Sequence, residues 1–247
     1  MHSKQTYSKA PITEAILDIQ VEKAPSYAAS MLLDCQDQVR ADYPTKRELK
    51  TAIAQFTLDE YTASASASSP QVHGFAFISE DKKQLFQVRA DGFTANRLAP
   101  YSGWNTFGQE ARRLWDIYRT TTKPTRVTRI ALRYINRIDI PSSRVELKDY
   151  FHTSPEVAPG LPQTMAGFFM QIVLPLEDVK ATVNIVETIV EPLQPGNVSV
   201  VLDLDFFRTV ELPGTEEELW ALFEILRAKK NVVFDTCITE KTKKLIR

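Results

Sequence analysis

Residues 127–140, VTRIALRYINRIDI, carry the clearest structural pattern in the chain. Apolar side chains recur at the even positions, at Ile130, Leu132, Tyr134, Ile138 and Ile140. A period of two is typical of a strand that buries one face. Pro141 follows directly and ends the pattern, because proline has no amide hydrogen to donate to a neighbouring strand. The stretch therefore predicts a long strand whose even positions face a core.

The chain after this strand predicts an antiparallel sheet followed by two helices. Three further strand-like runs follow with the spacing of a meander, at 167–174, 181–190 and 198–208. Thr215 and Glu218 have the spacing of a capping box, in which a hydroxyl and a carboxylate bind free amides at a helix start. We expect one helix to begin there and a second helix to begin near Val232.

The chain before residue 127 mixes strands and helices in the same way. Strands are expected from alternation at 11–21, 49–58, 72–78 and 84–98. Helical spacing of apolar residues predicts helices at 27–39 and 102–118, the second with a wide aromatic face. Small residues without periodicity at 62–70 predict a mobile loop.

These elements define an α+β fold class, with antiparallel sheets and helices packed on one face. The polar stretch ending at Pro124 is the expected boundary between residues 1–122 and residues 123–247, which form either two domains or one continuous domain. The second half is then a four-stranded sheet followed by two helices. The segments 13–19 and 128–134 share a faint pattern, so the two halves are candidates for an internal duplication.

Composition narrows the class of protein. The 30 basic and 31 acidic side chains give a formal net charge of −1, so no bulk field attracts nucleic acid or a membrane. Apolar runs fall short of the roughly 20 residues that a membrane helix needs, and the N-terminus lacks a secretory pattern. Cys35 and Cys237 suit reduced core thiols better than a disulfide. We expect a cytoplasmic protein with no membrane contact.

Motifs that carry chemistry are missing from the sequence. No Gly-x-Gly occurs that could present backbone amides to a phosphate, and no Gly-x-Ser-x-Gly elbow is present. Three histidines stand far from one another and from both cysteines, unlike zinc ligands, at positions 2, 73 and 152. The sequence therefore predicts no catalytic residue, no metal and no cofactor, and it favours a protein that is not an enzyme.

A stripe of arginines is the strongest candidate for binding. Arg129, Arg133 and Arg137 share one parity on the 127–140 strand and lie opposite its apolar face. Their guanidinium groups suit a nucleotide, an RNA backbone or an acidic peptide. The alternative is a structural ladder with carboxylates on neighbouring strands, from the set Asp203, Asp205, Glu187 and Glu191.

Five other residues complete the set of candidate binding residues. Asp203 and Asp205 share one face of their strand, about 6 to 7 Å apart along it. They suit either a divalent ion or acid–base work, or they point outward and pair with basic groups. Arg97, Tyr101 and Asn136 join them because polar groups in an aromatic-rich neighbourhood need partners.

Three segments together resemble a known family. They are PITEA at 11–15, GFTANRLAPYSGW at 92–104 and RIALRYINRI at 129–138. The chain is similar to a sporadically distributed family of uncharacterised bacterial proteins that share a leading Pro-Ile-x-Glu-Ala segment. The resemblance implies no established activity, but patchy distribution points to toxin–antitoxin or phage-defence loci. The element order of the second half also resembles the SecB-type export chaperones, which implies an apolar protein-binding groove.

Two functions from different classes follow. The first is a non-catalytic protein-interaction module, chaperone-like or accessory, with a protein partner and the capacity to form a homo-oligomer. The alternative is a nucleotide or nucleic-acid binding protein or enzyme that uses Arg129, Arg133 and Arg137. An apolar surface patch would favour the first, and an electropositive cleft would favour the second.

Overall fold

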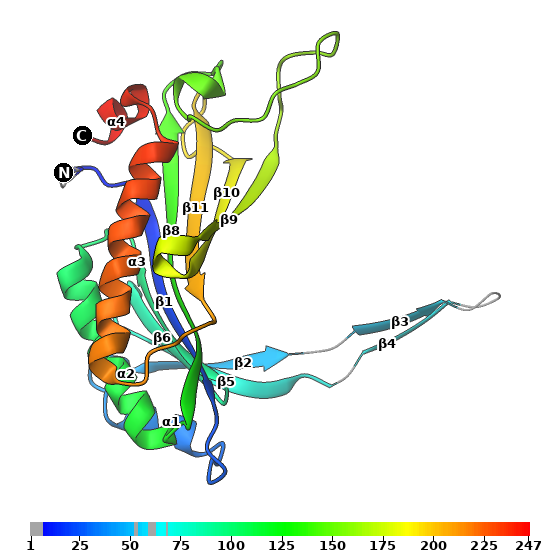
Figure 1. Cartoon of the computed structure of the whole chain (residues 1–247). Coiled ribbons are helices and arrows are strands. Elements are labelled where there is room, and N and C mark those ends of the chain that lie inside the picture. The colour runs from blue at the N-terminus through cyan, green and yellow to red at the C-terminus, as the bar shows by residue number, and fades with distance from the viewer. Residues whose placement is uncertain (1–6, 52–53, 59–62, 68) are drawn as a thin grey trace.

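The strand predicted at 127–140 is β8 (Arg126–Ile140), and it lies beside β1 (Ile12–Glu22), the central strand of a nine-stranded sheet. A computed structural model describes residues 7–51, 54–58, 63–67 and 69–247. Every strand pair in the sheet is antiparallel, in the order β2-β5-β6-β7-β1-β8-β11-β10-β9 (Figure 1). The α+β class and the antiparallel sheet are therefore confirmed.

The remaining elements complete this frame. The other strands of the sheet are β2 (Thr45–Thr51), β5 (Gln71–Ile78), β6 (Gln84–Arg89), β7 (Gly92–Leu98), β9 (Phe169–Leu176), β10 (Ala181–Val190) and β11 (Val198–Arg208). The helices in the described residues are α1 (Met31–Asp37), α2 (Trp104–Thr122), α3 (Glu216–Cys237) and α4 (Glu240–Ile246). Two short 3-10 turns also occur, η1 (Leu147–Asp149) and η2 (Glu177–Val179).

The core lies on the face of the sheet that β8 presents through its even positions. The predicted apolar residues of β8 are all fully or almost fully buried. The sheet register aligns Phe93 with Ile19, and Ile19 with Ile130, so all three share this face. Helix α2 covers it through Trp115, whose ring centroid lies 5.9 Å from that of Phe93. Helix α3 covers the same face at Tyr134, because the Lys230 Nζ lies 4.1 Å from the centroid of that ring.

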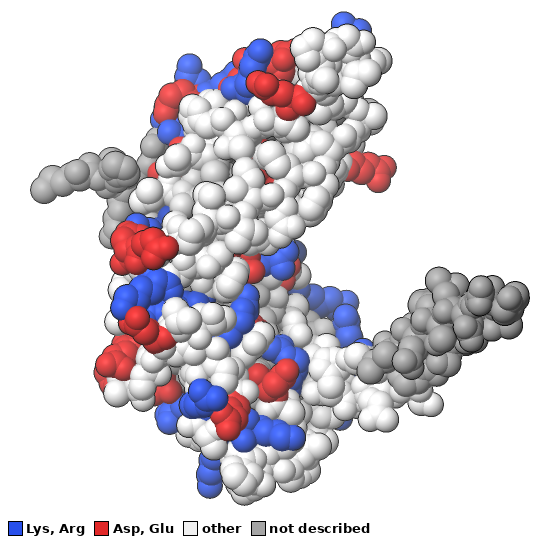
Figure 2. Space-filling model, turned by 45° about the vertical axis from the view of Figure 1, so that its right-hand side comes forward, with Lys and Arg blue, Asp and Glu red and all other residues white. Residues whose placement is uncertain are grey.

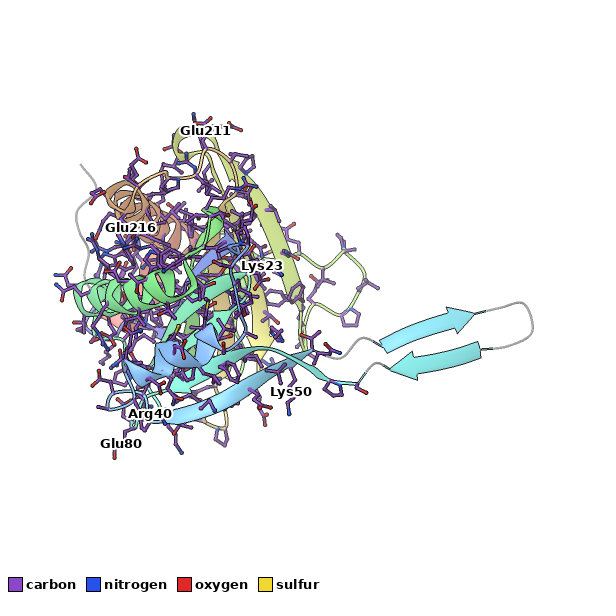
Figure 3. The ribbon with its side chains drawn as sticks, turned by 90° about the horizontal axis from the view of Figure 1, so that it is seen from below. Lys23, Arg40, Lys50, Glu80, Glu211 and Glu216 are labelled. Atoms are coloured by element: carbon purple, nitrogen blue, oxygen red, sulfur yellow. The ribbon has the colours of Figure 1, made fainter. Side chains whose placement is uncertain are left out.

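The β2–β5 region carries a projecting ribbon. Strands β3 (Ala54–Leu58) and β4 (Ala63–Ala67) pair with each other and not with the large sheet. Figure 3 shows this ribbon leaving the body beyond Lys50 and pointing away from helices α2 and α3. The loop predicted at 62–70 is therefore wrong over 63–67, while residues 62 and 68 lie outside the described residues. The prediction missed this strand because alternating Ala and Ser give no hydrophobic pattern, whereas the backbone of 63–67 pairs with that of 54–58.

Two other predicted elements have different boundaries. The strand expected over 84–98 is a hairpin of β6 and β7, in which Arg89 pairs with Gly92 across a two-residue turn. The second C-terminal helix does not begin near Val232, because α3 continues to Cys237 through residues 227–231, which contain neither proline nor glycine. Helix α3 ends at Cys237, because Ile238 is extended and forms a β-bridge with Phe151.

Both parts of the chain repeat one connection. The first strand of each part pairs with the last strand of the same part, β1 with β7 and β8 with β11. A long helix follows each of these last strands, α2 after β7 and α3 after β11. The sheet joins the two parts where β1 pairs with β8. The division at residues 122 and 123 stays a prediction.

Candidate functional site

The face of the sheet opposite Tyr134 and Phe93 carries the charged side chains of the central strands. We call it the open face, defined by Asp18 on β1, Arg129 and Arg133 on β8, and Asp203 and Asp205 on β11. In Figure 1, helices α2 and α3 lie on the other side of β1 and β8, and the β3–β4 ribbon extends on the open side. Alternation along each strand places these polar side chains opposite the core.

Arg133 and Asp203 form the closest ion pair of the open face. The Arg133 Nε donates to Asp203 Oδ1 at 2.9 Å, and Nη2 donates to Oδ2 at 2.5 Å. This two-nitrogen geometry is the strongest that a guanidinium offers to a carboxylate. The side chain of Asp203 is 11% exposed and that of Arg133 is 43% exposed. Arg133 therefore remains accessible from solvent while its carboxylate partner is mostly covered.

Arg129 joins two carboxylates from the strands on either side of β8. Its Nη1 lies 3.1 Å from Asp18 Oδ1, and its Nη2 lies 3.6 Å from Asp205 Oδ2. Its guanidinium also stacks 5.0 Å from the ring centroid of Phe207. Burial raises the pKa of the Asp205 carboxyl, and the nearby Arg129 and Arg133 partly oppose that shift. The guanidinium of Arg129 thus ties β1 to β11 across β8.

Asp18 extends the network to strands that the sequence patterns did not connect to the stripe. Arg89 on β6 lies 3.1 Å from Asp18 Oδ2, and the Thr94 hydroxyl on β7 donates to the same oxygen at 2.7 Å. Arg89 also donates to Thr94 Oγ1 at 2.8 Å. In the sequence, the one indication that Asp18 lies on the same face as the stripe was its position between the apolar residues Leu17 and Ile19. Its partners depend on strand order, which parity does not give.

The predicted ladder forms in part. Asp203 and Asp205 pair with Arg133 and Arg129, as that interpretation requires. Glu191 contributes only its backbone carbonyl, which accepts from Arg137 Nη2 at 2.6 Å. Arg137 otherwise binds near the end of β8, with its Nε 3.1 Å from Asp139 Oδ1. The stripe is therefore split, because Arg137 belongs to a separate cluster.

Glu187 does not pair with the stripe at all. It lies opposite Leu202 on the core face and is 1% exposed, and neither carboxylate oxygen has a hydrogen-bond partner among the residues that the structure describes. Burial raises the pKa of the Glu187 carboxyl to about 7. Its place in the ladder was predicted wrongly, because its parity in β10 directs it to the helices. A buried carboxyl without a partner costs free energy whenever it is ionised.

The other candidate residues lie apart from the open face. The Tyr101 hydroxyl lies 3.1 Å from the Tyr134 hydroxyl, and Asn136 donates to the carbonyls of Tyr134 and Leu202 at 3.2 and 3.0 Å. Burial raises the pKa of Tyr101 to about 12. Arg97 pairs in register with Ala15 on the core face, and its buried Nε has no hydrogen-bond partner within the described part of the chain. The structure therefore brings together Arg129, Arg133, Asp203 and Asp205, and it places Arg97, Tyr101 and Asn136 on the opposite face.

The carboxylates of the open face are all engaged in ion pairs. Each carboxylate of the open face already contacts a guanidinium, so the oxygens that a base or a metal ligand would use are engaged in ion pairs. Within the described residues, no group of three His, Cys, Asp or Glu side chains is placed to hold a metal ion. The same ion pairs hold the side chains in defined positions, which lowers the entropy cost of binding a partner.

Edge strand β9 is the second notable surface. Its eight residues contain no charged side chain, and Phe169, Val173 and Leu174 are each more than two-fifths exposed. Figure 2 shows a largely uncharged surface over the upper part of the molecule, where β9 lies, and mixed charges below it. The opposite edge, β2, carries Lys46, Arg47, Glu48 and Lys50. Charges of that kind protect an edge from pairing with another chain, and β9 lacks them.

Comparisons with known proteins add no relative. A scan against protein-family models finds no match. A search of curated proteins finds no match either. Among the described helices, none is long and apolar enough to cross a membrane. The class of protein therefore has to be argued from the fold and the site alone.

Proposed function

We propose that the chain is a non-catalytic protein-interaction module whose partner binds the open face. The observation that carries the proposal is a set of ion pairs, fixed across four strands, of which Arg133 is still 43% exposed. This proposal takes the helices to be packed on one face of the sheet, which leaves the other face for a partner. The proposal also assigns the protein to the cytoplasm.

The balance of charges favours a polypeptide partner. The open face contains two arginines and three aspartates, and Arg89 on β6 adds a third arginine through its contact with Asp18, so the positive and negative charges are balanced. A phosphate at either guanidinium would compete with the aspartate already bound there, Asp203 at Arg133 or Asp18 at Arg129. A protein surface can instead offer carboxylates, amides and cations together without breaking those pairs.

Two related halves are a further part of the proposal. The segments that share a faint pattern contain Leu17 and Leu132 at equivalent positions, and these two residues pair with each other in the sheet. Ala15 pairs with Tyr134, and Ile19 pairs with Ile130, which are again exchanged equivalents. Such pairing is what a duplication related by a local two-fold axis would produce. The open face then spans the junction of the two halves.

The biological setting is proposed from the family resemblance. In this setting, the module is an accessory or chaperone-like component of a bacterial toxin–antitoxin or phage-defence locus. The geometry contributes one supporting feature, a sheet face on the side away from helices α2 and α3, beside a projecting ribbon (Figure 1). Nucleotide or RNA binding at Arg129 and Arg133 is the competing proposal, supported by the exposure of Arg133.

The test compares two double variants by affinity purification from the native host. Arg133→Gln with Asp203→Asn removes both charges of the pair, so no buried charge is left alone. Arg40→Gln with Asp37→Asn is the matched control, because that pair has the same residue types and both of its side chains are exposed at the end of α1. The proposal expects one stoichiometric protein to co-purify with wild type and with the control, and to be lost from the first variant.

Other outcomes count against the proposal. A partner retained equally by both variants would show that the open face is not the binding surface. Nucleotide or RNA in the wild-type eluate, lost in the Arg133 variant, would establish the competing function. Thermal unfolding of all three proteins must give similar midpoints for either conclusion to stand.

A further inference from the structure

Strand β9 exposes a row of backbone groups at one edge of the sheet. Its only strand partner in the described residues is β10, so alternate amides and carbonyls of β9 face outward. No residue from Phe169 to Leu176 is charged. An occupant of this edge must therefore be an extended chain, because only a strand supplies donors and acceptors at that spacing.

Two apolar side chains flank the middle of the strand on the open face. Phe169 is 68% exposed and Val173 is 56% exposed, and they lie two residues on either side of Gln171. The register of β9 with β10, and of β10 with β11, places Gln171, Val186 and Asp203 in one row, which fixes the face. Exposed apolar groups at symmetric positions about one residue suit a symmetric occupant.

We propose that the occupant is a second copy of this chain, paired antiparallel through β9 about a two-fold axis at Gln171. In that register Phe169 of each copy lies opposite Val173 of the other, on the same face. Aromatic and β-branched side chains form favourable cross-strand pairs when they are directly opposite. The symmetry produces this contact twice and covers the two most exposed side chains of the strand.

The lack of charge is what favours a second copy over an unrelated strand. A two-fold axis brings each residue near its own equivalent, so a charged strand would repel itself. Strand β9 avoids that repulsion completely, whereas β2, with its lysines and arginine, does not. A heterologous partner would gain from charges that specify register, and β9 provides none.

Neighbouring registers are less favourable. An axis at Ile172 would place Phe169 opposite Pro175, which has no amide hydrogen for a ladder. An axis at Val173 would place Phe169 opposite Glu177, which lies beyond the strand in η2. Only the axis at Gln171 places the two exposed apolar residues, Phe169 and Val173, opposite each other.

The pairing would extend the proposed binding surface. A two-fold axis between antiparallel strands stands perpendicular to the sheet, so both open faces and both β3–β4 ribbons lie on one side. The two sheets would join into one, with nine strands from each copy. The inference itself depends only on β9 and does not require the proposed function to be correct.

The first experiment measures mass in solution across a concentration series. Wild type is expected to approach twice 28.0 kDa, and Val173→Lys is expected to remain at 28.0 kDa. Val210→Lys is the matched control, since Val210 is 58% exposed but lies outside β9, and it should dimerise like wild type. A monomeric wild type at the highest soluble concentration, or a dimer unaffected by Val173→Lys, would overturn the inference.

A second experiment tests the register. Gln171→Cys places a thiol on the axis, where directly opposite residues are about 4.5 to 5.5 Å apart between Cα atoms, within disulfide range. We expect rapid oxidation to a covalent dimer, while Ile172→Cys, which lies opposite Met170, should react slowly. Preferential cross-linking of Ile172→Cys would contradict the register. Partner capture by the monomeric Val173→Lys variant would support the open-face function independently of dimerisation.

Discussion

Arg133 on β8 grips Asp203 on β11 through two nitrogens, although the two residues are not directly opposite in the sheet. The residue opposite Arg133 is Asp205, and the residue opposite Asp203 is Ile135. The ion pair is therefore diagonal, and it leaves Asp205 to approach Arg129 at 3.6 Å. The diagonal contact thus lets the four charges of β8 and β11 form two ion pairs, Arg133 with Asp203 and Arg129 with Asp205.

Removing one member of this pair should destabilise the fold. Arg133→Ala leaves the mostly covered Asp203 carboxylate without its guanidinium, so we expect the free energy of unfolding to fall by about 1 to 2 kcal/mol. Arg133→Gln with Asp203→Asn should cost less, because no charge is left unpaired. Urea unfolding of the three proteins measures both values. Equal losses in the single and double variants would show that the pair itself, and not the orphaned charge, matters.

Glu187 should make stability depend on pH. Its carboxyl has a pKa of about 7 in the fold, above its ordinary value of 4.5, because of burial. Between those values the folded chain holds a proton that the unfolded chain releases, so stability is complete below about pH 4.5 and falls as the pH rises through 7. The total loss is at most about 3 kcal/mol.

Glu187→Gln is expected to remove most of this slope and to raise stability at pH 8. Glu191→Gln is the control, since Glu191 lies in the exposed turn after β10. Unfolding free energies at pH 5, 6, 7 and 8 provide the measurement. A wild-type slope that survives in Glu187→Gln would mean that groups other than Glu187 set the pH dependence.

Gly92 should tolerate no side chain, because Ile19 and Arg89 leave no room for one. A Cβ at this position would lie 2.8 Å from the Ile19 carbonyl and 3.0 Å from Arg89 Nη2. We expect Gly92→Ala to lower the free energy of unfolding by about 1 to 3 kcal/mol and to loosen Arg89 from Asp18. Gly167→Ala, with open space around it, should leave stability unchanged or raise it by up to about 1 kcal/mol. Similar stabilities for the two variants would contradict the crowding at Gly92.

The start of α3 depends on its capping box. The Thr215 hydroxyl accepts from the Glu218 amide at 3.2 Å, and the Glu218 carboxylate accepts from the Thr215 amide at 3.2 Å. Thr215→Ala should therefore cost about 1 kcal/mol, while Thr215→Ser should remain near wild type. Thermal unfolding distinguishes the two. A Ser variant as unstable as the Ala variant would implicate the lost methyl group instead.

Both cysteines should be inert in the folded protein. Burial raises the pKa of each thiol, Cys35 and Cys237, to about 12. Because the thiolate is the reactive form, a thiol reagent at pH 8 should label neither residue until the chain is unfolded by denaturant. Fast labelling of native protein would reveal local opening. Slow labelling also keeps these thiols from interfering with the Gln171→Cys experiment.

The sequence by itself determined features that depend on neighbours along the chain. Alternation in residues 127–140 gave the strand and its buried face, since side-chain direction in a strand follows from parity alone. The capping box gave the first turn of α3, because both hydrogen bonds connect residues three positions apart.

Only the tertiary structure decided which side chains meet. Asp18, Arg89 and Arg129 are far apart in the sequence and join because β6, β7, β1 and β8 are adjacent in the sheet. Strand order and register are set by the packing of the whole core, so no local pattern contains them. The same reason separates Arg97 from the arginine stripe, and it leaves β9, with its uncharged sequence, at an open edge. Asn136, by contrast, is separated from the stripe by its parity on β8 alone.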